Sequence, residues 1–439
     1  AKRRPLRTAL AGPSAGVIAG GHIARAAGFP NVITGDMGGT SFDVALIVDG
    51  ESALAAQTTI DFGMVVRTPM IEMTTIGAGG GSIAWVDRGG LLQIGPESAG
   101  ADPGPVCYGL GNVRPTVTDA NVVLGRINAE RPIGGKLDRL DVEASKQALL
   151  THVGEPLKLD AEEAADAVIR VANAAMAGAI RLVSIERGHD PTNFALMPFG
   201  GGGSLHAGAL IQDVGLAQAL VPRFPGVTSA LGCIIADMRH DFVRTLNKPL
   251  DAVDITALDA DIVSIAQDGA ALLDSAGASF EARQTVVEFD MSYVGQTHTV
   301  VTPIDLDIGE AGSEITTERI RVAFESAYRR IYGRLLDDVP IRLLNLRMAV
   351  IGKRPQFDLT ALRPDDGLTV EAARTGERQV RAKGHWRPTP IFDRLALPVG
   401  AEIAGPAILE QADTTIFVDP GLCARVDEFG NVILERQAS

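Results

Sequence analysis

The sequence predicts an α/β fold in its first half and a β-rich domain at its end. Two apolar, β-branched runs at residues 31–34 and 44–48 flank a glycine pair and predict a hairpin. A buried strand at 194–197 leads through four glycines into a helix from about 205 to 216. Beyond Pro340 apolar residues recur at strand spacing. With 439 residues, 46% of them hydrophobic, the chain can bury large cores and should form two or three domains.

The remaining elements follow from hydrophobic periodicity and from glycine and proline stops. The clearest is an amphipathic helix at 161–188, which ends at Gly188 and should lie in a core. The others are a helix at 15–27, a loop-rich stretch at 69–125, helices at 251–283 and 316–333, a strand region at 285–302 and a late turn at 428–431. We expect an α/β lobe at 1–245, a mixed α+β segment at 246–338 and a β-rich C-terminal domain at 339–439.

Composition excludes several classes of protein. A net charge of −14 leaves no basic surface for nucleic acid, so anionic ligands must be held locally. The three cysteines lie far apart, which argues against a disulfide framework or a thiolate zinc site. No apolar run reaches the length expected of a membrane span, and the start lacks a secretion signal. We therefore expect a cytoplasmic protein that binds neither membrane nor nucleic acid.

The stretch GDMGGTSFDV at 35–44 is the strongest candidate for a ligand site. Gly38 and Gly39 let backbone N–H groups approach an anionic oxygen, and Thr40 and Ser41 add hydroxyl donors, which together suit a phosphate. Two carboxylates flank the turn and would hold Mg²⁺, usually through water, or orient an attacking water. They are Asp36 and Asp43, with Asp36 the proposed metal ligand. The alternative is an ordinary tight hairpin with solvated aspartates.

Two further glycine-rich stretches could contribute to the same site. Gly200, Gly201, Gly202 and Gly203 precede a helix, whose free N–H groups can hold a phosphate and whose bare backbone lets a nucleoside lie flat. This stretch is neither a Walker A loop nor a dinucleotide fingerprint, so alone it is a weak indication. The loop at 77–82 lies between apolar flanks, which favours a functional loop over a surface linker.

Together these blocks resemble the hydantoinase A / 5-oxoprolinase family, which includes subunits of acetone and acetophenone carboxylases. The matching blocks run in order along the chain at 11–17, 36–46, 75–85, 95–104, 116–125, 183–190, 199–207, 226–241, 293–296 and 405–408. The resemblance implies an ATPase lobe of the actin, sugar-kinase and heat-shock-ATPase kind (ribonuclease H-like) at 1–245. It makes 36–43 the phosphate loop of the second lobe and 200–204 the loop on the adenosine side, and it favours a cofactor-binding role for His206.

The activity implied by the resemblance is an ATP-dependent ring opening of a cyclic amide such as a hydantoin, 5-oxoproline or a related lactam. ATP would phosphorylate the carbonyl oxygen, because amide resonance makes that carbonyl a poor electrophile. The chain would be the ATP-using subunit, or part of it, beside a hydantoinase B-type partner subunit. One alternative is the ATP-using subunit of an acetone or acetophenone carboxylase; another is a non-catalytic scaffold.

Two features depart from the family pattern. Relatives usually begin with a further lobe that carries its own glycine loop, so we expect that this missing N-terminal lobe is supplied separately or that the chain is a split, cleaved or fragmentary subunit. Relatives also commonly carry an Asp two residues before a His where this chain has Glu72 and Thr74, which puts a further metal site there in doubt. Glu186 and Arg187 are expected to form an ion pair.

Four other polar residues remain open in role. His206 could contact a phosphate or the substrate, or could be a satisfied capping group. Cys107 could be a nucleophile but is more simply a buried cysteine. Asp119 and Asn121 could bind substrate or shape the cleft.

Overall fold

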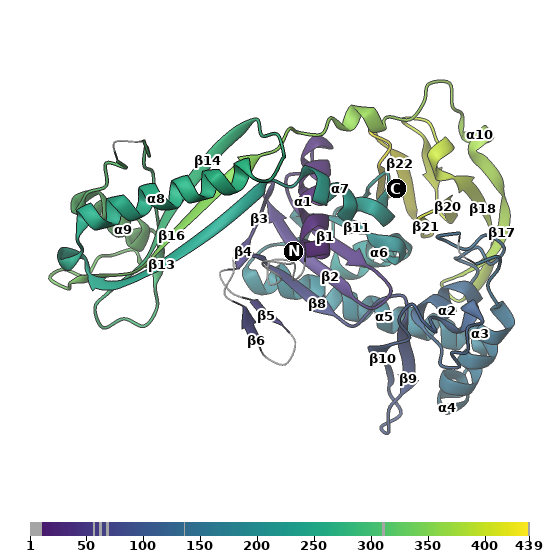
Figure 1. The fold of residues 1–439 in the computed structure, drawn as a ribbon. Helices are drawn as coiled ribbons and strands as arrows, with labels where there is room; N and C mark the ends of the chain where they lie inside the picture. Colours follow the sequence, from purple (N-terminus) through teal and green to yellow (C-terminus); the bar gives the residue numbers. More distant parts are fainter. Residues whose placement is uncertain are drawn as a thin grey trace. The chain divides into compact units, whose positions relative to one another are not determined.

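The computed structural model describes residues 11–55, 58–60, 64–66, 70–135, 137–309 and 312–437. The chain forms two compact units (Figure 1). Unit 1 comprises Ala1–Ile234 and Asp358–Ser439, and unit 2 comprises Ile235–Phe357. Unit 2 is therefore an insertion between two parts of unit 1.

A nine-stranded mixed sheet is the centre of unit 1, in the order β19-β22-β23-β12-β11-β1-β2-β3, with β8 also paired to β2. Its central strand β1 is parallel to β11 and antiparallel to β2. The strands are β1 (Val32–Met37), β2 (Phe42–Val48), β3 (Glu51–Ser52), β8 (Met73–Ile76), β11 (Ala195–Phe199), β12 (Gln218–Val221), β19 (Glu402–Ala404), β22 (Leu422–Val426) and β23 (Val432–Arg436).

Helices cover both faces of this sheet. In α1 (Ala11–Ala26), a Cβ on Gly20 would lie 3.1 Å from Thr34 and 3.3 Å from Met197. In α6 (Gly200–Val214), a Cβ on Gly203 would lie 3.6 Å from Pro198 and 3.7 Å from Met37. Because neighbouring side chains of a strand point to opposite faces, α1 and α6 pack on opposite sides of β1 and β11.

The rest of unit 1 surrounds this layered core. Between β2 and α6 lie β4 (Leu54–Ala55), β5 (Thr58–Ile60), β6 (Met64–Val66), β7 (Met70–Ile71), β9 (Ser82–Val86), β10 (Leu92–Ser98), α2 (Val117–Val123), α3 (Val142–Leu149), α4 (Glu155–Leu157) and α5 (Ala161–Val183). After β12 comes α7 (Thr228–Ile235). The C-terminal part adds α10 (Val370–Ala373) and the sheet β17-β18-β20-β21, made of β17 (Arg374–Ala382), β18 (His385–Asp393), β20 (Ala407–Gln411) and β21 (Thr414–Val418).

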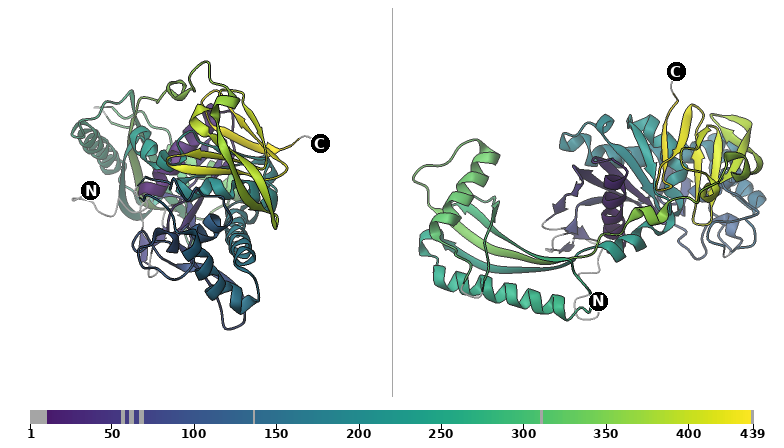
Figure 2. Two further views of the ribbon diagram at one scale, coloured as in Figure 1. Left: turned by 90° about the vertical axis from the view of Figure 1, so that its right-hand side faces the viewer. Right: turned by 90° about the horizontal axis from the view of Figure 1, so that it is seen from above.

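Unit 2 has its own core. Its sheet has the order β13-β16-β14-β15, and α8 runs alongside these strands (Figure 2). The elements are β13 (Met238–Pro249), α8 (Ile255–Asp274), β14 (Ala282–Tyr293), β15 (Val300–Ile304), α9 (Thr317–Tyr332) and β16 (Ile341–Lys353). Tyr293, Phe324 and Tyr328 form an aromatic cluster between β14 and α9.

The units divide the chain at different residues from the expected boundaries at 245 and 338. Strand β16 was expected in a C-terminal domain, but it pairs with β13 and β14 inside unit 2. The C-terminal strand β23 pairs with β12 and so extends the main sheet of unit 1. Pairing between strands far apart in sequence therefore sets these boundaries, and local composition does not reveal it.

Local predictions agree more closely with the structure. The hairpin, the long core helix and the turn between β22 and β23 are confirmed. Against expectation, residues 161–187 are long and apolar enough, by length and composition, to cross a membrane. Of the apolar 18-residue window within this helix, 56% is buried inside the protein, so one side of the helix lies in the core.

Candidate ligand-binding site

The hairpin between β1 and β2 ends in an open glycine turn. Asp36 lies opposite Asp43, and Met37 lies opposite Phe42, so residues 38–41 form the turn. Gly38 and Gly39 are exposed, and a Cβ added to either would meet nothing within 4 Å. Neither glycine has a positive φ. The fold thus does not require glycine at these positions, and free space adjoins their backbone.

The second glycine-rich loop braces this turn. The N–H of Gly80 donates to the carbonyl of Gly38 at 3.0 Å, and the N–H of Gly81 donates to that of Gly39 at 2.6 Å. A Cβ on Gly79 would lie 2.6 Å from backbone atoms of Thr40 and Ser41. The loop at 77–82 therefore needs glycine for close packing. Its N–H groups hold the turn by donating to the turn's carbonyl groups.

Two carboxylates face each other beside the turn. Asp43 accepts hydrogen bonds from Ser41 Oγ at 2.9 Å and from Thr75 Oγ1 at 2.5 Å, which fix its orientation. Burial, followed by the charge of Asp43, raises the pKa of Asp36 to about 6, although a hydrogen bond from Ser229 lowers it. Asp36 is therefore a carboxylate whose ionised form would be stabilised by a nearby cation.

The pair also fits a magnesium ion. Within the part of the chain that the structure describes, no cluster of three or more His, Cys, Asp or Glu side chains is placed to hold a metal. Magnesium needs fewer protein ligands, because one or two carboxylates complete its shell together with water and phosphate oxygens. Asp36 and Asp43, opposed across the hairpin, supply such a donor set.

Glu72 is engaged elsewhere. Its carboxylate lies 2.7 Å from the guanidinium of Arg187. The sequence predicted that Arg187 pairs with Glu186, whereas in the structure its acidic partner is Glu72.

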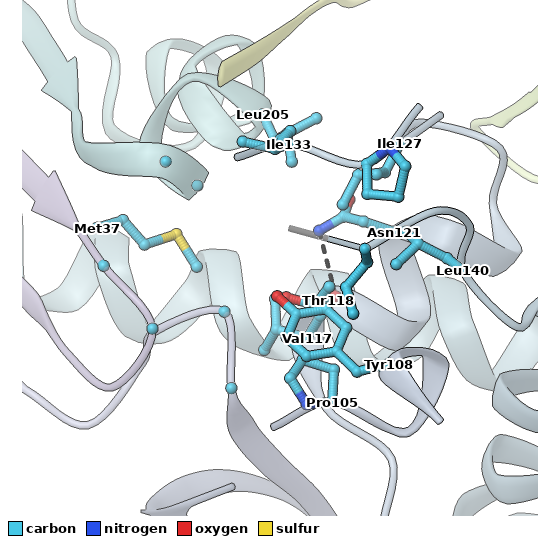
Figure 3. A pocket seen from close by; sticks show the side chains of 18 of the residues that line it. Met37, Pro105, Tyr108, Val117, Thr118, Asn121, Ile127, Ile133, Leu140 and Leu205 are labelled. Carbon is cyan, nitrogen blue, oxygen red and sulfur yellow. Dashed lines mark hydrogen bonds between the residues drawn. The ribbon is translucent and has the colours of Figure 1, made fainter. Parts of the chain in front are cut away.

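A pocket of about 220 Å³ adjoins the glycine turn (Figure 3). Gly38, Gly39, Gly201 and Gly202 form part of its wall. Most of the remaining wall is apolar, and includes Tyr108, Val117, Ile127, Ile133, Leu140 and Leu205. Asp36 and Asp43 are not among its lining residues, because they point to the α1 face of the hairpin, whereas Met37 points to the α6 face and into the pocket.

The four glycines at 200–203 form the first turn of α6, not a loop before a helix that starts at 205. Gly200 has a φ of +77°, and a Cβ there would lie 2.4 Å from the carbonyl oxygen of Met37 and 2.6 Å from Asp36 Oδ1. Gly200 is therefore required where α6 meets β1, while Gly201 and Gly202 present bare backbone to the pocket.

His206 lines the same pocket from the second turn of α6. Its Nδ1 lies 2.6 Å from Asn173 Oδ1, which can only accept, so Nδ1 carries the proton. Burial and then the charge of Arg126 lower the pKa of His206 to about 3, so the ring is neutral at pH 7. The alternative of a helix-capping histidine is wrong, because His206 is buried in the second turn.

Asp119 and Cys107 have structural surroundings. The Asp119 carboxylate caps α2 and accepts hydrogen bonds from the backbone N–H groups of Val106, Cys107 and Thr116. Burial, followed by the charge of Asp119, raises the pKa of the Cys107 thiol far above its ordinary value. This protonated, buried thiol matches the structural alternative and makes a nucleophilic role unfavourable.

Sequence reasoning did not find the apolar wall of the pocket. Much of this wall comes from residues that lie in neither a helix nor a strand, namely Ile127, Pro132, Ile133, Leu137 and Leu140. The only sequence indication was the general one that long glycine-rich and proline-rich stretches inside a domain are often functional.

Two family models match the chain. Residues 1–242 match the hydantoinase/oxoprolinase family, and residues 256–436 match the hydantoinase/oxoprolinase C-terminal domain. The chain is 35% identical over 432 residues to caprolactamase subunit alpha of Pseudomonas jessenii, covering 97% of this chain and 61% of that protein. It is 34% identical over 445 residues to the acetophenone carboxylase gamma subunit of Aromatoleum aromaticum, covering 98% of this chain and 59% of that protein.

Two solved structures of such proteins have a fold similar to that of this chain. The nucleotide-free structure of acetone carboxylase, an enzyme of ATP-dependent acetone carboxylation, superposes with a TM-score of 0.78 at 26% identity, covering 97% of this chain and 61% of that one. The structure of the ATP-dependent caprolactamase from Pseudomonas jessenii gives a TM-score of 0.74 at 33% identity, covering 97% and 62%. The chain thus spans about three fifths of the length of these relatives.

Proposed function

The chain belongs to the hydantoinase/oxoprolinase family, and on that premise we propose that it binds ATP and uses it to open a cyclic amide. The substrate class is a hydantoin, 5-oxoproline or a related lactam. The chain acts as the ATP-using subunit, or as part of it, together with a B-type partner subunit. Relatives named as alpha, beta and gamma subunits support the existence of a partner.

The observation that carries the proposal is the open, braced turn at 38–41. Gly38 and Gly39 have no steric or conformational need for glycine, yet their backbone adjoins free space. Their carbonyl groups accept hydrogen bonds from the N–H groups of Gly80 and Gly81. A turn held in this way keeps its shape while its exposed edge receives a phosphate, as in other backbone-built anion sites.

In this proposal the base and the magnesium-bound phosphates of the nucleotide bind on opposite sides of the hairpin. The pocket on the α6 side takes the base, and the phosphates cross the turn, where Thr40 and Ser41 add hydroxyl donors. Asp36 and Asp43 hold Mg²⁺, and the ion when bound neutralises charge on the phosphates. Ser41 and Thr75 orient the Asp43 carboxylate for that task. Unit 1 is then a nucleotide lobe of the actin and sugar-kinase kind.

The chemistry requires transfer of the γ-phosphoryl group to the lactam carbonyl oxygen. That oxygen forms the new P–O bond, while the bond to the β-phosphate oxygen breaks and ADP leaves with its electron pair. Water then adds to the activated carbon, and the C–N bond of the resulting tetrahedral intermediate breaks as the ring nitrogen takes up a proton. This step opens the ring and leaves an acyl phosphate, which a second water hydrolyses to a carboxylate and free phosphate. The phosphorylation replaces a resonance-stabilised carbonyl by a carbon with a good leaving group.

A ketone carboxylase is the second candidate. The acetophenone carboxylase subunit is almost as similar in sequence as the caprolactamase subunit, and the acetone carboxylase structure has the higher TM-score. In this function the same phosphorylation activates the enol oxygen of a ketone for reaction with bicarbonate-derived carbon.

ATP turnover by the chain in complex with its partner subunit separates the candidates. A hydrolase releases ADP when a lactam is added, whether or not bicarbonate is present. A carboxylase releases ADP with a ketone and forms product only with bicarbonate. If neither substrate raises turnover, magnesium-dependent nucleotide binding is undetectable, and Asp36→Ala changes nothing, the chain is a non-catalytic scaffold and the proposal fails.

A further inference from the structure

Two residues of the pocket wall each carry a buried side-chain atom that lacks a hydrogen-bond partner. Asn121 is 2% exposed and His206 is 1% exposed, and both belong to the pocket wall. Asn121 Oδ1 and His206 Nε2 have no hydrogen-bond partner among the residues that the structure describes. Such atoms are rare in folded proteins, and leaving them unpaired is costly.

The acceptor character of both atoms follows from their other contacts. Asn121 Nδ2 donates to the backbone carbonyl of Val117 at 3.2 Å. The opposite assignment of the amide would place two acceptor oxygens against each other. In His206 the proton lies on Nδ1, which donates to Asn173, so Nε2 offers only a lone pair. The low pKa of His206 keeps it neutral.

The position of these two residues limits the chemical class of ligand that the pocket can accept. Asn121 extends from α2 toward the cavity, among Tyr108, Val117 and Leu140 (Figure 3). His206 reaches the same cavity from α6, one residue beyond Leu205. A flat apolar group with N–H donors on its edge would fill the pocket and satisfy both acceptors.

We propose that Asn121 Oδ1 and His206 Nε2 select a purine that carries an exocyclic 6-amino group. The inference rests on the proposed function, since it assigns the base of the bound nucleotide to this pocket. The 6-amino group carries two N–H bonds, one for each acceptor. A purine without that group leaves both atoms unpaired, and a site built to receive a donor discriminates strongly against ligands that lack it.

The test compares the binding of three nucleotides to the protein in its purified complex. ATP carries the amino group, purine riboside triphosphate lacks it, and N6,N6-dimethyl-ATP carries no N–H on that nitrogen. We expect ATP to bind about tenfold to a hundredfold more tightly than either analogue. This comparison needs no variant, so it does not depend on how a substitution affects folding.

Variants then assign the selection to the two side chains. Asn121→Leu keeps the size of the side chain and removes the acceptor, so the preference for ATP over purine riboside triphosphate should fall to about threefold or less. Binding of purine riboside triphosphate should stay near the wild-type value, which a merely structural role of Asn121 would not produce. Ser204→Ala is the matched control, because Ser204 Oγ is also buried without a partner but does not line the pocket. This control should keep the full preference.

The outcomes separate the two proposals. Equal affinity of wild-type protein for all three nucleotides overturns the assignment of the pocket and leaves ATP binding intact. An equal loss of affinity for ATP and purine riboside triphosphate in Asn121→Leu also overturns it. Failure of every nucleotide to bind overturns the proposed function and this inference with it.

Discussion

Gly39 lies in the hairpin turn and Gly79 lies in the loop that packs against it, but a methyl group added to each would meet very different surroundings. At Gly39 nothing lies within 4 Å, whereas at Gly79 backbone atoms of Thr40 and Ser41 lie at 2.6 Å. Glycine at 79 is explained by packing inside the protein. Glycine at 39 is not explained in this way, and a bound anion is the explanation that we propose.

The same contrast extends to the start of α6. Gly200 is required by its positive φ and by its contact with β1, whereas Gly201 has nothing closer than 3.9 Å to its Cβ position and lines the pocket. Each glycine-rich stretch therefore contains members with different purposes. Free space around the Cβ position, combined with a place on the turn or the pocket wall, distinguishes the glycines that we propose to adjoin a ligand.

The largest expected effect is on ligand binding by Gly39→Val. The substitution fills the free space at the turn without a clash inside the protein, so we expect the affinity for MgATP to fall at least about a hundredfold, or 2.7 kcal/mol. The free energy of unfolding should change by less than about 0.5 kcal/mol. Titration calorimetry and urea unfolding measure the two quantities.

Gly376→Val is the control for this substitution. Gly376 is also exposed, has no atom within 4 Å of its Cβ position and no positive φ, but it lies on β17 away from the turn. It should leave both affinity and stability unchanged. The contrast between the two glycines is broken if Gly39→Val binds MgATP as the wild type does.

The second effect is on stability, by Gly79→Ala. The added methyl group must displace the turn or the loop that braces it, so we expect a loss of about 2 kcal/mol in the free energy of unfolding. Urea unfolding at pH 7.5 measures this loss. A variant as stable as the wild type would show that the loop at 77–82 does not hold the turn through close packing.

The smallest effect is the pH dependence that Asp36 confers on binding. Its pKa is raised to about 6, so the carboxylate takes up a proton as the pH falls through 6 and then competes with Mg²⁺. The affinity for MgATP should fall by up to about tenfold per pH unit below 6. Measured between pH 5 and 8, this dependence should vanish in Asp36→Asn, which binds weakly throughout.

Stability gives an independent measure of the same group. A carboxyl whose pKa is higher in the folded than in the unfolded state loses stability as the pH rises from about 4 to about 6, because the folded state disfavours the ion. Asp36→Asn should therefore unfold with a free energy about 1–2 kcal/mol higher at pH 8 and little changed at pH 4. A destabilised variant at pH 8 would mean that Asp36 has a structural partner and not a ligand to hold.

The local elements of the site were predictable from sequence because their causes are local. Alternating apolar residues around a glycine pair specify the β1–β2 hairpin, and apolar spacing with a glycine stop specifies α5. The opposition of Asp36 and Asp43 follows from the hairpin register alone. The family resemblance likewise depends on short blocks that can be read in order along the chain.

Only the tertiary structure decided how distant segments meet. Gly80 and Gly81 reach Gly38 and Gly39 across some 40 residues of chain, and β23 joins β12 from the far end of the sequence. The unpaired acceptors of Asn121 and His206 become informative only when α2 and α6 enclose one cavity. The reason is physical: a segment's own side chains set its periodicity and turns, whereas long-range contacts depend on how all the segments together bury their apolar faces and pair their polar groups.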